Sequence, residues 1–140
     1  MGKPFYTRLT PAGEQKFAAA AVSGEPVSFH EMAVGDGGGT LPDPSRIDGL
    51  VNERFRAQIN RVIIADQAAN VIRVEMIMMP QVGGFWLREA ALYDDEGICI
   101  AVANMAPTYK PLLAEGAGRL QSVNMWIAVS KTSDVTIKAD

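Results

Sequence analysis

The sequence predicts a single α+β domain, mainly antiparallel β-sheet with one N-terminal helix, built as a sandwich or as a sheet covered by the helix. Helix signals gather only near the start of the chain, and the segments after residue 50 alternate apolar and polar residues between turn signals. The chain has 140 residues, of which 48% are hydrophobic and 21% charged, as expected for one globular domain with a real core. We therefore expect one domain over residues 1–140.

The predicted helix follows Thr10, whose hydroxyl can cap the first turn, and Pro11, which suits the first helical position. Good helix formers fill residues 14–21, and Gly24 is placed to end the helix. We interpret its alanine run as a packing face.

A strand is predicted over residues 27–34 because apolar and polar residues mix there and its ends are β-branched. The glycines of residues 35–39 and the prolines of residues 42–44 then predict a long irregular loop. A helical turn over residues 47–51 could follow the loop.

The later segments are predicted to be strands. Residues 54–60 alternate, the phase flips past Arg61, and this flip suggests a β-bulge near Asn60-Arg61. A hairpin connection over residues 66–70 leads to a return strand, and further strands are predicted at the following positions: residues 72–78, 85–93, 98–105, 122–130 and 134–138.

Strict alternation within residues 85–93 places Trp86 and Leu92 in the core, with Glu89 and Tyr93 on the opposite face. Residues 94–97 form a turn that ends in glycine. Residues 106–119 are predicted to be a long loop rich in Pro, Gly and Ala, either a docking arm or a plain connection.

The sequence contains no catalytic, cofactor-binding or metal-binding constellation. The glycine-rich loop lacks the Lys-Ser/Thr pair of a phosphate-binding loop and the spaced acids of a calcium loop. The acidic run Asp94-Asp95-Glu96 suits a solvated turn better than an acid–base pair. Cys99 is expected to be a small buried hydrophobe and His30 a structural residue, and one of each cannot form a zinc site of the usual kind.

Charge and hydropathy exclude several partners. The net charge is -3 with no basic stripe, so nucleic acid is not an expected partner. Apolar runs are too short to span a membrane, and the start lacks a signal-peptide hydrophobic region. We expect synthesis in a cytoplasm and no membrane insertion.

Two charged or aromatic groups are candidates for contacts with a partner. Arg88 and Glu89 interrupt an apolar strand, and a charge there must be paired or lie at the edge of a buried surface. They therefore form an internal ion pair, lie at the rim of the core, or make a contact across an interface. Tyr109-Lys110-Pro111 stands in the predicted loop over residues 106–119. The alternative for that tripeptide is packing against its own sheet.

Five ordered motifs resemble the N-terminal domain of phage tail-collar fibre proteins, from contractile-tailed phages of the P2 type and related prophages and pyocins. Residues 6–13 are similar to the family's "Y-x-x-L-T-x-x-G", and Met32-Ala33-Val34-Gly35-Asp36-Gly37 to its "M-A-V-G-D-G". The other three motifs occupy residues 50–60 (L-x-N-E-x-x-R-x-x-I-N), residues 83–89 (G-G-x-x-x-R-E) and residues 108–116 (T-Y-K-P-x-x-x-E-G).

This resemblance implies a structural domain of a virion tail that attaches the fibre to baseplate or tail proteins, with receptor binding left to a distal part. It also implies a homo-oligomer, a trimer, and no catalytic residues. Three regions have few inward-facing demands of their own: the loops over residues 35–44 and 106–119 and the segment before the helix, residues 5–9. Loops carry function more often than stability, so the docking surface is expected in the first two. Tyr109 is the expected aromatic anchor. The candidate interface residues are Asp36, Gly37, Arg88, Glu89, Tyr109, Lys110 and Pro111.

Two other functions stay open at this point. A receptor- or glycan-binding module would use exposed loop aromatics, for which Tyr109 and Trp86 are the candidates. A surface-polysaccharide hydrolase would need a cleft with two well-placed carboxylates, but the acids here fall mainly in predicted turns and on solvent faces.

Overall fold

A computed structural model describes residues 5–112, 120–129 and 135–137 of the chain. It contains one α-helix, two 3-10 turns and a series of β-strands. The helix is α1 (Pro11–Ser23), and the turns are η1 (Gly37–Gly39) and η2 (Pro44–Arg46). The strands are β1 (Thr7–Leu9), β2 (Val27–Gly35), β3 (Glu53–Gln58), β4 (Arg61–Asp66), β5 (Val71–Met78), β6 (Phe85–Asp94), β7 (Cys99–Lys110), β8 (Gln121–Ala128) and β9 (Val135–Ile137).

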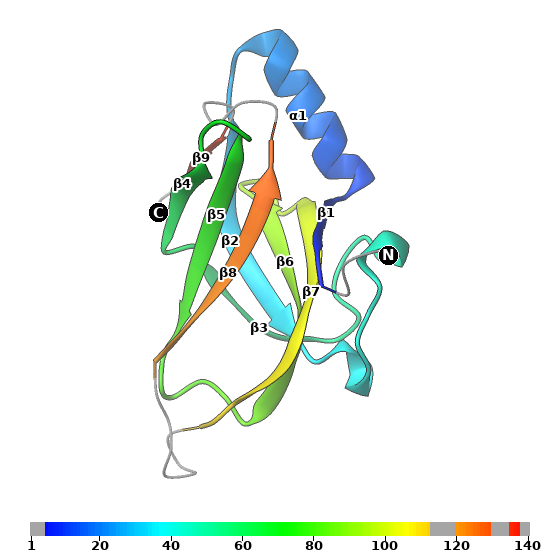
Figure 1. Ribbon diagram of the computed structural model, residues 1–140, viewed down its shortest axis with the longest axis vertical. Helices are drawn as coiled ribbons and strands as arrows, with labels where there is room; N and C mark the ends of the chain where they lie inside the picture. The colour runs from blue at the N-terminus through cyan, green and yellow to red at the C-terminus, as the bar shows by residue number, and fades with distance from the viewer. Residues whose placement is uncertain (1–4, 113–119, 130–134, 138–140) are drawn as a thin grey trace.

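The strands form two sheets that face each other (Figure 1). The larger sheet has the order β1-β7-β6-β2-β3, with β9 added beside β2, and the smaller one has the order β4-β5-β8. All pairs are antiparallel except β2 with β9, which is parallel. The predicted α+β domain, mainly antiparallel with one N-terminal helix, is confirmed, and its architecture is the sandwich.

The main core lies between the two sheets. The smaller sheet buries the alternating side chains that the sequence predicted to face inward, namely Ile72, Val74, Met76, Met78, Val123, Met125 and Ile127. A second cluster, of Ala33, Ala91, Tyr93 and Val102, lies on the other face of the larger sheet, where Ile47 and Leu50 pack against it. The segment between β2 and β3 therefore covers a sheet face and is part of the folded domain.

Both predicted ends of α1 are confirmed. The Thr10 hydroxyl oxygen accepts a hydrogen bond from the Gly13 amide at 2.9 Å, and Gly24 ends the helix with a left-handed φ of 78°. Phe17 anchors the helix by an edge-to-face contact with Phe29, whose ring centroid is 6.3 Å away. Among the described residues, no helix has the length and hydropathy needed to cross a membrane.

The bulge predicted at Asn60-Arg61 is wrong, because the chain changes sheets there. The Ile59 amide still bonds to the His30 carbonyl of β2 at 3.0 Å, whereas the Asn60 amide bonds to the Glu75 carbonyl of β5 at 2.7 Å. The hydrophobic phase flips because β3 and β4 face the core from opposite sheets. The Glu75 carboxylate fixes this crossing by accepting hydrogen bonds from the side chains of Asn60 and Arg61.

Two predicted loop assignments also need correction. The predicted loop over residues 106–119 is wrong for its first part, because residues 106–110 continue β7 as far as Lys110. Residues 113–119 of that loop lie outside the described part of the chain. The helical turn expected over residues 47–51 is absent, and turns occur instead at η1 and η2. In each 3-10 turn an aspartate caps the chain: Asp36 accepts from the Gly38 amide and Asp43 from the Ser45 amide.

Trp86 does not lie in the core, contrary to the sequence-based expectation. The pairing of β6 with β7 shifts register between Leu87 and Glu89, so the strict alternation is broken. Leu87 and Leu92 therefore both face the main core, while Trp86 is 45% exposed. Glu89 and Tyr93 do lie on the face opposite Leu92, as predicted.

This correction changes the expected mutational costs in β6. Leu87→Ala should lower the free energy of unfolding by about 2–5 kcal/mol, because it leaves a cavity in a fully buried position. Trp86→Ala should cost about 1 kcal/mol, mainly its contact with Tyr109. Urea denaturation of both variants measures the difference, and a larger loss for Trp86→Ala would restore the original placement.

Candidate docking surface

Three of the five sequence motifs meet at one carboxylate. Glu89 of β6 is fully buried, and its Oε2 accepts hydrogen bonds from the amides of Gly37 at 3.0 Å and Asn52 at 2.9 Å. Its Oε1 accepts from the Val51 amide at 2.8 Å. An ionised carboxylate is an acceptor only, so three amide donors match its chemistry. Glu89 thus fastens both ends of residues 36–52, hereafter the covering loop, to the larger sheet.

Two glycines at the start of the covering loop, Gly35 just before it and Gly37 within it, are required by this arrangement. A side chain at Gly35 would collide with the Asn52 carbonyl and the Glu89 carboxylate. Gly37 has a φ of 68°, in the left-handed region, and this conformation turns its amide toward Glu89. The glycine-rich segment is therefore a tight carboxylate-binding turn.

Asp36 organises the outer side of the covering loop. Its carboxylate accepts hydrogen bonds from Asn52 Nδ2 at 2.8 Å, the Gly38 amide at 2.8 Å and Arg54 Nη1 at 3.1 Å. Partial burial raises the pKa of Asp36, but these hydrogen bonds outweigh burial, so the pKa lies below its ordinary value. Asp36 is thus held as an anion.

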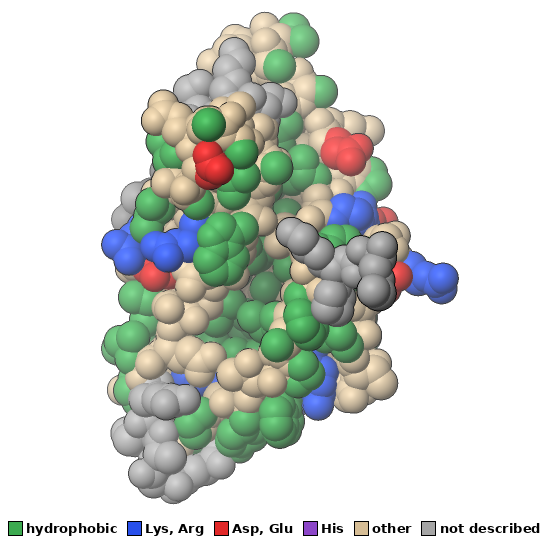
Figure 2. Space-filling model, viewed as in Figure 1, with side chains coloured by type: hydrophobic (Ala, Val, Ile, Leu, Met, Phe, Trp, Pro, Cys, Tyr) green, Lys and Arg blue, Asp and Glu red, His purple; other side chains and the backbone are tan. Residues whose placement is uncertain are grey.

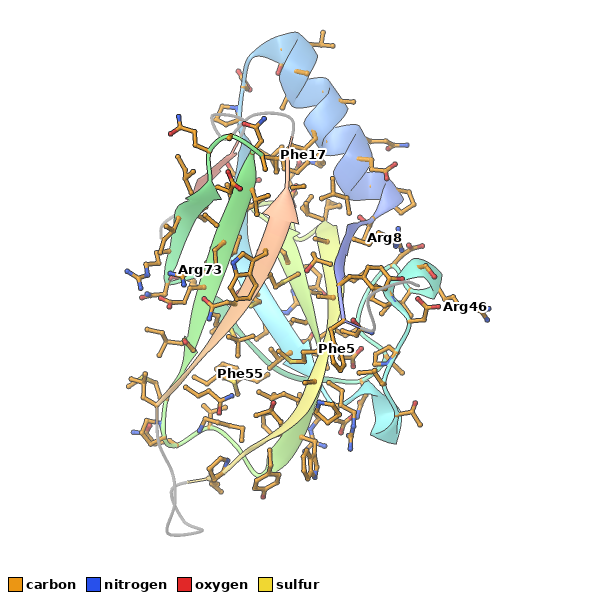
Figure 3. All side chains as sticks on the ribbon, in the orientation of Figure 1. Phe5, Arg8, Phe17, Arg46, Phe55 and Arg73 are labelled. Atoms are coloured by element: carbon orange, nitrogen blue, oxygen red, sulfur yellow. The ribbon has the colours of Figure 1, made fainter. Side chains whose placement is uncertain are left out.

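Residues of the N-terminal motif bind the middle of the covering loop. Arg8 of β1 donates to the Pro44 carbonyl at 2.6 Å and to the Ile47 carbonyl at 2.5 Å, and its guanidinium also bridges to Asp48 at 3.1 Å. Figure 3 shows Arg8 pointing toward the loop that carries Arg46. The Tyr6 hydroxyl donates to Asp43 at 2.8 Å. The first motif therefore holds the middle of the covering loop, whose two ends are held by Glu89.

The remaining motifs join the adjacent ends of β6 and β7. Lys110 is fully buried, and its ammonium group donates to the carbonyls of Met79 at 3.3 Å, Val82 at 2.6 Å and Pro111 at 3.0 Å. The Gly84 amide donates to the Lys110 carbonyl at 2.8 Å. A side chain at Gly83 would meet the carbonyls of Lys110 and Pro111, so glycine is needed for this approach.

Two aromatic side chains stand exposed at these strand ends. Trp86 and Tyr109 are cross-strand neighbours whose ring centroids lie 5.5 Å apart in an edge-to-face contact. The Arg88 guanidinium lies 5.5 Å from the Trp86 ring and donates to the Asp36 carbonyl at 3.0 Å. We call Trp86, Arg88 and Tyr109 the aromatic surface. Figure 2 shows hydrophobic side chains gathered at this lower end of the molecule.

The acidic turn between β6 and β7 is more ordered than the sequence suggested. Asp94 is buried and accepts hydrogen bonds from the amides of Glu96 and Ile98, while Lys16 of α1 bridges Asp94 at 3.1 Å and also binds Glu96. Hydrogen bonds to Glu96 and Asp94 raise the pKa of Lys16. The cluster joins α1 to the sheet. Burial raises the pKa of Cys99 to about 11, so its thiol is protonated at neutral pH.

Comparison with known proteins explains why these motifs occur together. The family model for the N-terminal domain of phage tail-collar fibre proteins matches residues 1–140. The chain belongs to the phage tail-collar fibre protein family. It is 47% identical over 142 residues to the "Probable tail fiber protein" of Escherichia phage P2, and it spans 21% of that protein's length. No solved structure gives a significant match.

The structure places the predicted interface residues of this tail-collar domain in two groups. Tyr109 lies at the surface, and Arg88, Pro111 and Asp36 are partly buried. Glu89, Lys110 and Gly37 are buried, and Arg88 and Glu89 do not pair with each other but bind backbone groups of the covering loop. Glu115 and Gly116 lie outside the described residues. Sequence reasoning did not single out Trp126, although a tryptophan on the solvent face of an alternating strand was a usable signal.

The Glu89 site makes a direct prediction for the tail-collar domain. Glu89→Gln should lower the free energy of unfolding by about 2–3 kcal/mol, because the amide presents a donor to buried N–H groups. Hydrogen exchange should accelerate at Gly37, Val51 and Asn52. Glu31→Gln, at a half-exposed site 3.6 Å from Arg56, is the control and should change little. Unchanged exchange in Glu89→Gln would contradict this role.

The lowered pKa of Asp36 predicts that the stability of the domain depends on pH. A carboxylate whose pKa is lower in the fold stabilises the folded state above its unfolded pKa of about 4, and loses this contribution as pH falls through its folded pKa. Wild type should therefore be more stable than Asp36→Asn at neutral pH, and the difference should shrink from about pH 5 downward. Urea unfolding at stepped pH measures this, and a difference that grows on acidification would refute it.

Proposed function

We propose that this domain is the structural attachment end of a tail fibre, fastening the fibre to the baseplate of a phage or phage-derived contractile tail through the aromatic surface. The single observation that carries the proposal is the exposed Trp86–Tyr109 pair, flanked by Arg88 and backed by two fully buried charged anchors. Trp, Tyr and Arg are the residues most enriched among binding hot spots.

The two buried charged residues, Glu89 and Lys110, preorganise the aromatic surface. Lys110 and Glu89 stand on the same two-stranded segment as Tyr109 and Arg88, and each is held by three hydrogen bonds to backbone groups. A preorganised surface loses less conformational entropy on association than a mobile loop does. This favours a rigid docking surface over a flexible arm.

Family membership supports a protein partner on the tail, and resemblance to the family further supports a homo-oligomeric, trimeric fibre. We take the partners to be baseplate or tail proteins and the site of action to be the virion tail. The domain is proposed to be non-enzymatic. The Asp94-Asp95-Glu96 cluster does line a small polar pocket beside α1, but Asp94 and Glu96 are bound there by Lys16. A glycan or ester hydrolysis assay on the purified domain tests this last point.

Tyr109→Ala and Trp86→Ala should each weaken binding to tail particles assembled without fibres by about tenfold or more, because each removes a hot-spot aromatic. Binding is measured by sedimentation with labelled domain. Ile98→Ala, at an exposed apolar residue away from this surface, is the matched control.

The melting temperatures of the variants distinguish a loss of docking from a loss of folding. Variants that melt within a few degrees of wild type but fail to bind support the docking role. Normal binding by both variants, or binding lost only through unfolding, would contradict it. Normal tail binding together with lost binding to a glycan array would favour the glycan-binding alternative.

A further inference from the structure

A second surface lies on the open side of the sandwich. A groove of about 520 Å³ runs between β1 and β8, which in the described part of the chain are edge strands of the two sheets. Its floor is formed by the small side chains of Ala90 and Ala103, with Met125 beside them, all buried. In the space-filling view, recessed hydrophobic side chains mark the middle of this face (Figure 2).

The rim of the groove is aromatic and uncharged. Phe5, Tyr6 and Trp126 line it and remain 41%, 37% and 53% exposed, respectively. Figure 3 shows Phe5 beside β7, at this rim. None of the described lining residues carries a charge, so a charged ligand group would find no counter-charge among them. It suits a large apolar side chain.

The edge of β8 beside the groove offers backbone hydrogen bonds. In the described part of the chain β8 pairs only with β5, and the Val129 amide donates to Asn70 on that side at 2.9 Å. Antiparallel alternation then directs the N–H and C=O groups of Ser122, Asn124 and Trp126 away from β5. The Asn124 Oδ1 atom is also buried without a hydrogen-bond partner among the described residues.

We infer that the groove receives an extended segment of the tail protein that holds the fibre. The segment inserts one large uncharged apolar side chain over Ala90 and Ala103, and its backbone hydrogen-bonds to the edge of β8 at Ser122 and Asn124. Strand addition of this kind takes affinity from backbone bonds and specificity from pockets for side chains. The inference rests on the proposed function, because it names the partner segment for the same attachment.

A second copy of this chain is a poorer occupant. The described strands that carry large apolar side chains already belong to the two sheets of their own chain. A second copy could insert one of these strands into the groove only by unfolding. The groove and the aromatic surface share β7, which carries Met105 at the groove and Tyr109 at the aromatic surface.

The test uses the domain and tail particles assembled without fibres. Asn124→Pro removes the amide that points away from β5 and is tolerated at a strand edge, whereas Asn124→Ala keeps that amide. Trp126→Ala removes the aromatic rim. We expect Asn124→Pro and Trp126→Ala to weaken binding about tenfold or more. Asn124→Ala should weaken binding less than Asn124→Pro, and Ile64→Ala, on the far edge of the same sheet, should bind as wild type.

Hydrogen exchange gives the independent measurement. Bound tails should slow exchange at the amides of Ser122 and Asn124 in the wild-type domain. Tail binding without this protection, and with Trp126→Ala binding normally, overturns the inference and leaves the proposed function standing. Failure of the wild-type domain to bind tails overturns both. Self-association that protects the same amides without tails assigns the groove to a second copy and also overturns the inference.

Discussion

A buried carboxylate is tolerable in a protein only when its charge is compensated, and Glu89 is compensated entirely by backbone amides. Those amides belong to two stretches of the covering loop that are separated by more than a dozen residues. The loop can therefore cover the outer face of the sheet only in a conformation that brings Gly37 and Val51 to the same point. Residues that look unrelated in the sequence follow from this requirement: the glycines, Asn52 and Asp36.

The same need to compensate buried polar groups explains why several cationic side chains here bind backbone carbonyls. Arg8 and Lys110 each donate to backbone carbonyls, and Arg88 does the same at Asp36. An irregular loop leaves many backbone groups without a ladder partner. Long cationic side chains can reach those groups and satisfy them. Arg8, Arg88 and Lys110 thus help to hold irregular segments in one conformation.

Local signals predicted three parts of the fold. Capping residues predicted the helix, period-two alternation predicted the buried faces of β5 and β8, and turn residues predicted the hairpin over residues 66–70. The exchange of sheets after Ile59 was not predictable, since a phase flip looks the same whether a strand bulges or crosses to another layer. Trp86 was misplaced because the register shift beside it depends on pairing with β7. Of the candidate site, Tyr109 and Arg88 could be named from the sequence, but the amides around Glu89 come together only through the tertiary fold.

The parallel pairing of β9 with β2 has a mechanical consequence. Val135, Thr136 and Ile137 lie alongside Val27, Ser28 and Phe29, and β2 is itself held by β6 and β3. Tension carried along the axis of β9 loads these hydrogen bonds in shear, so they must fail together and not one after another. Because β2 also leads directly into the covering loop at Gly35, a pull on β9 would be borne by the strand that supports this loop.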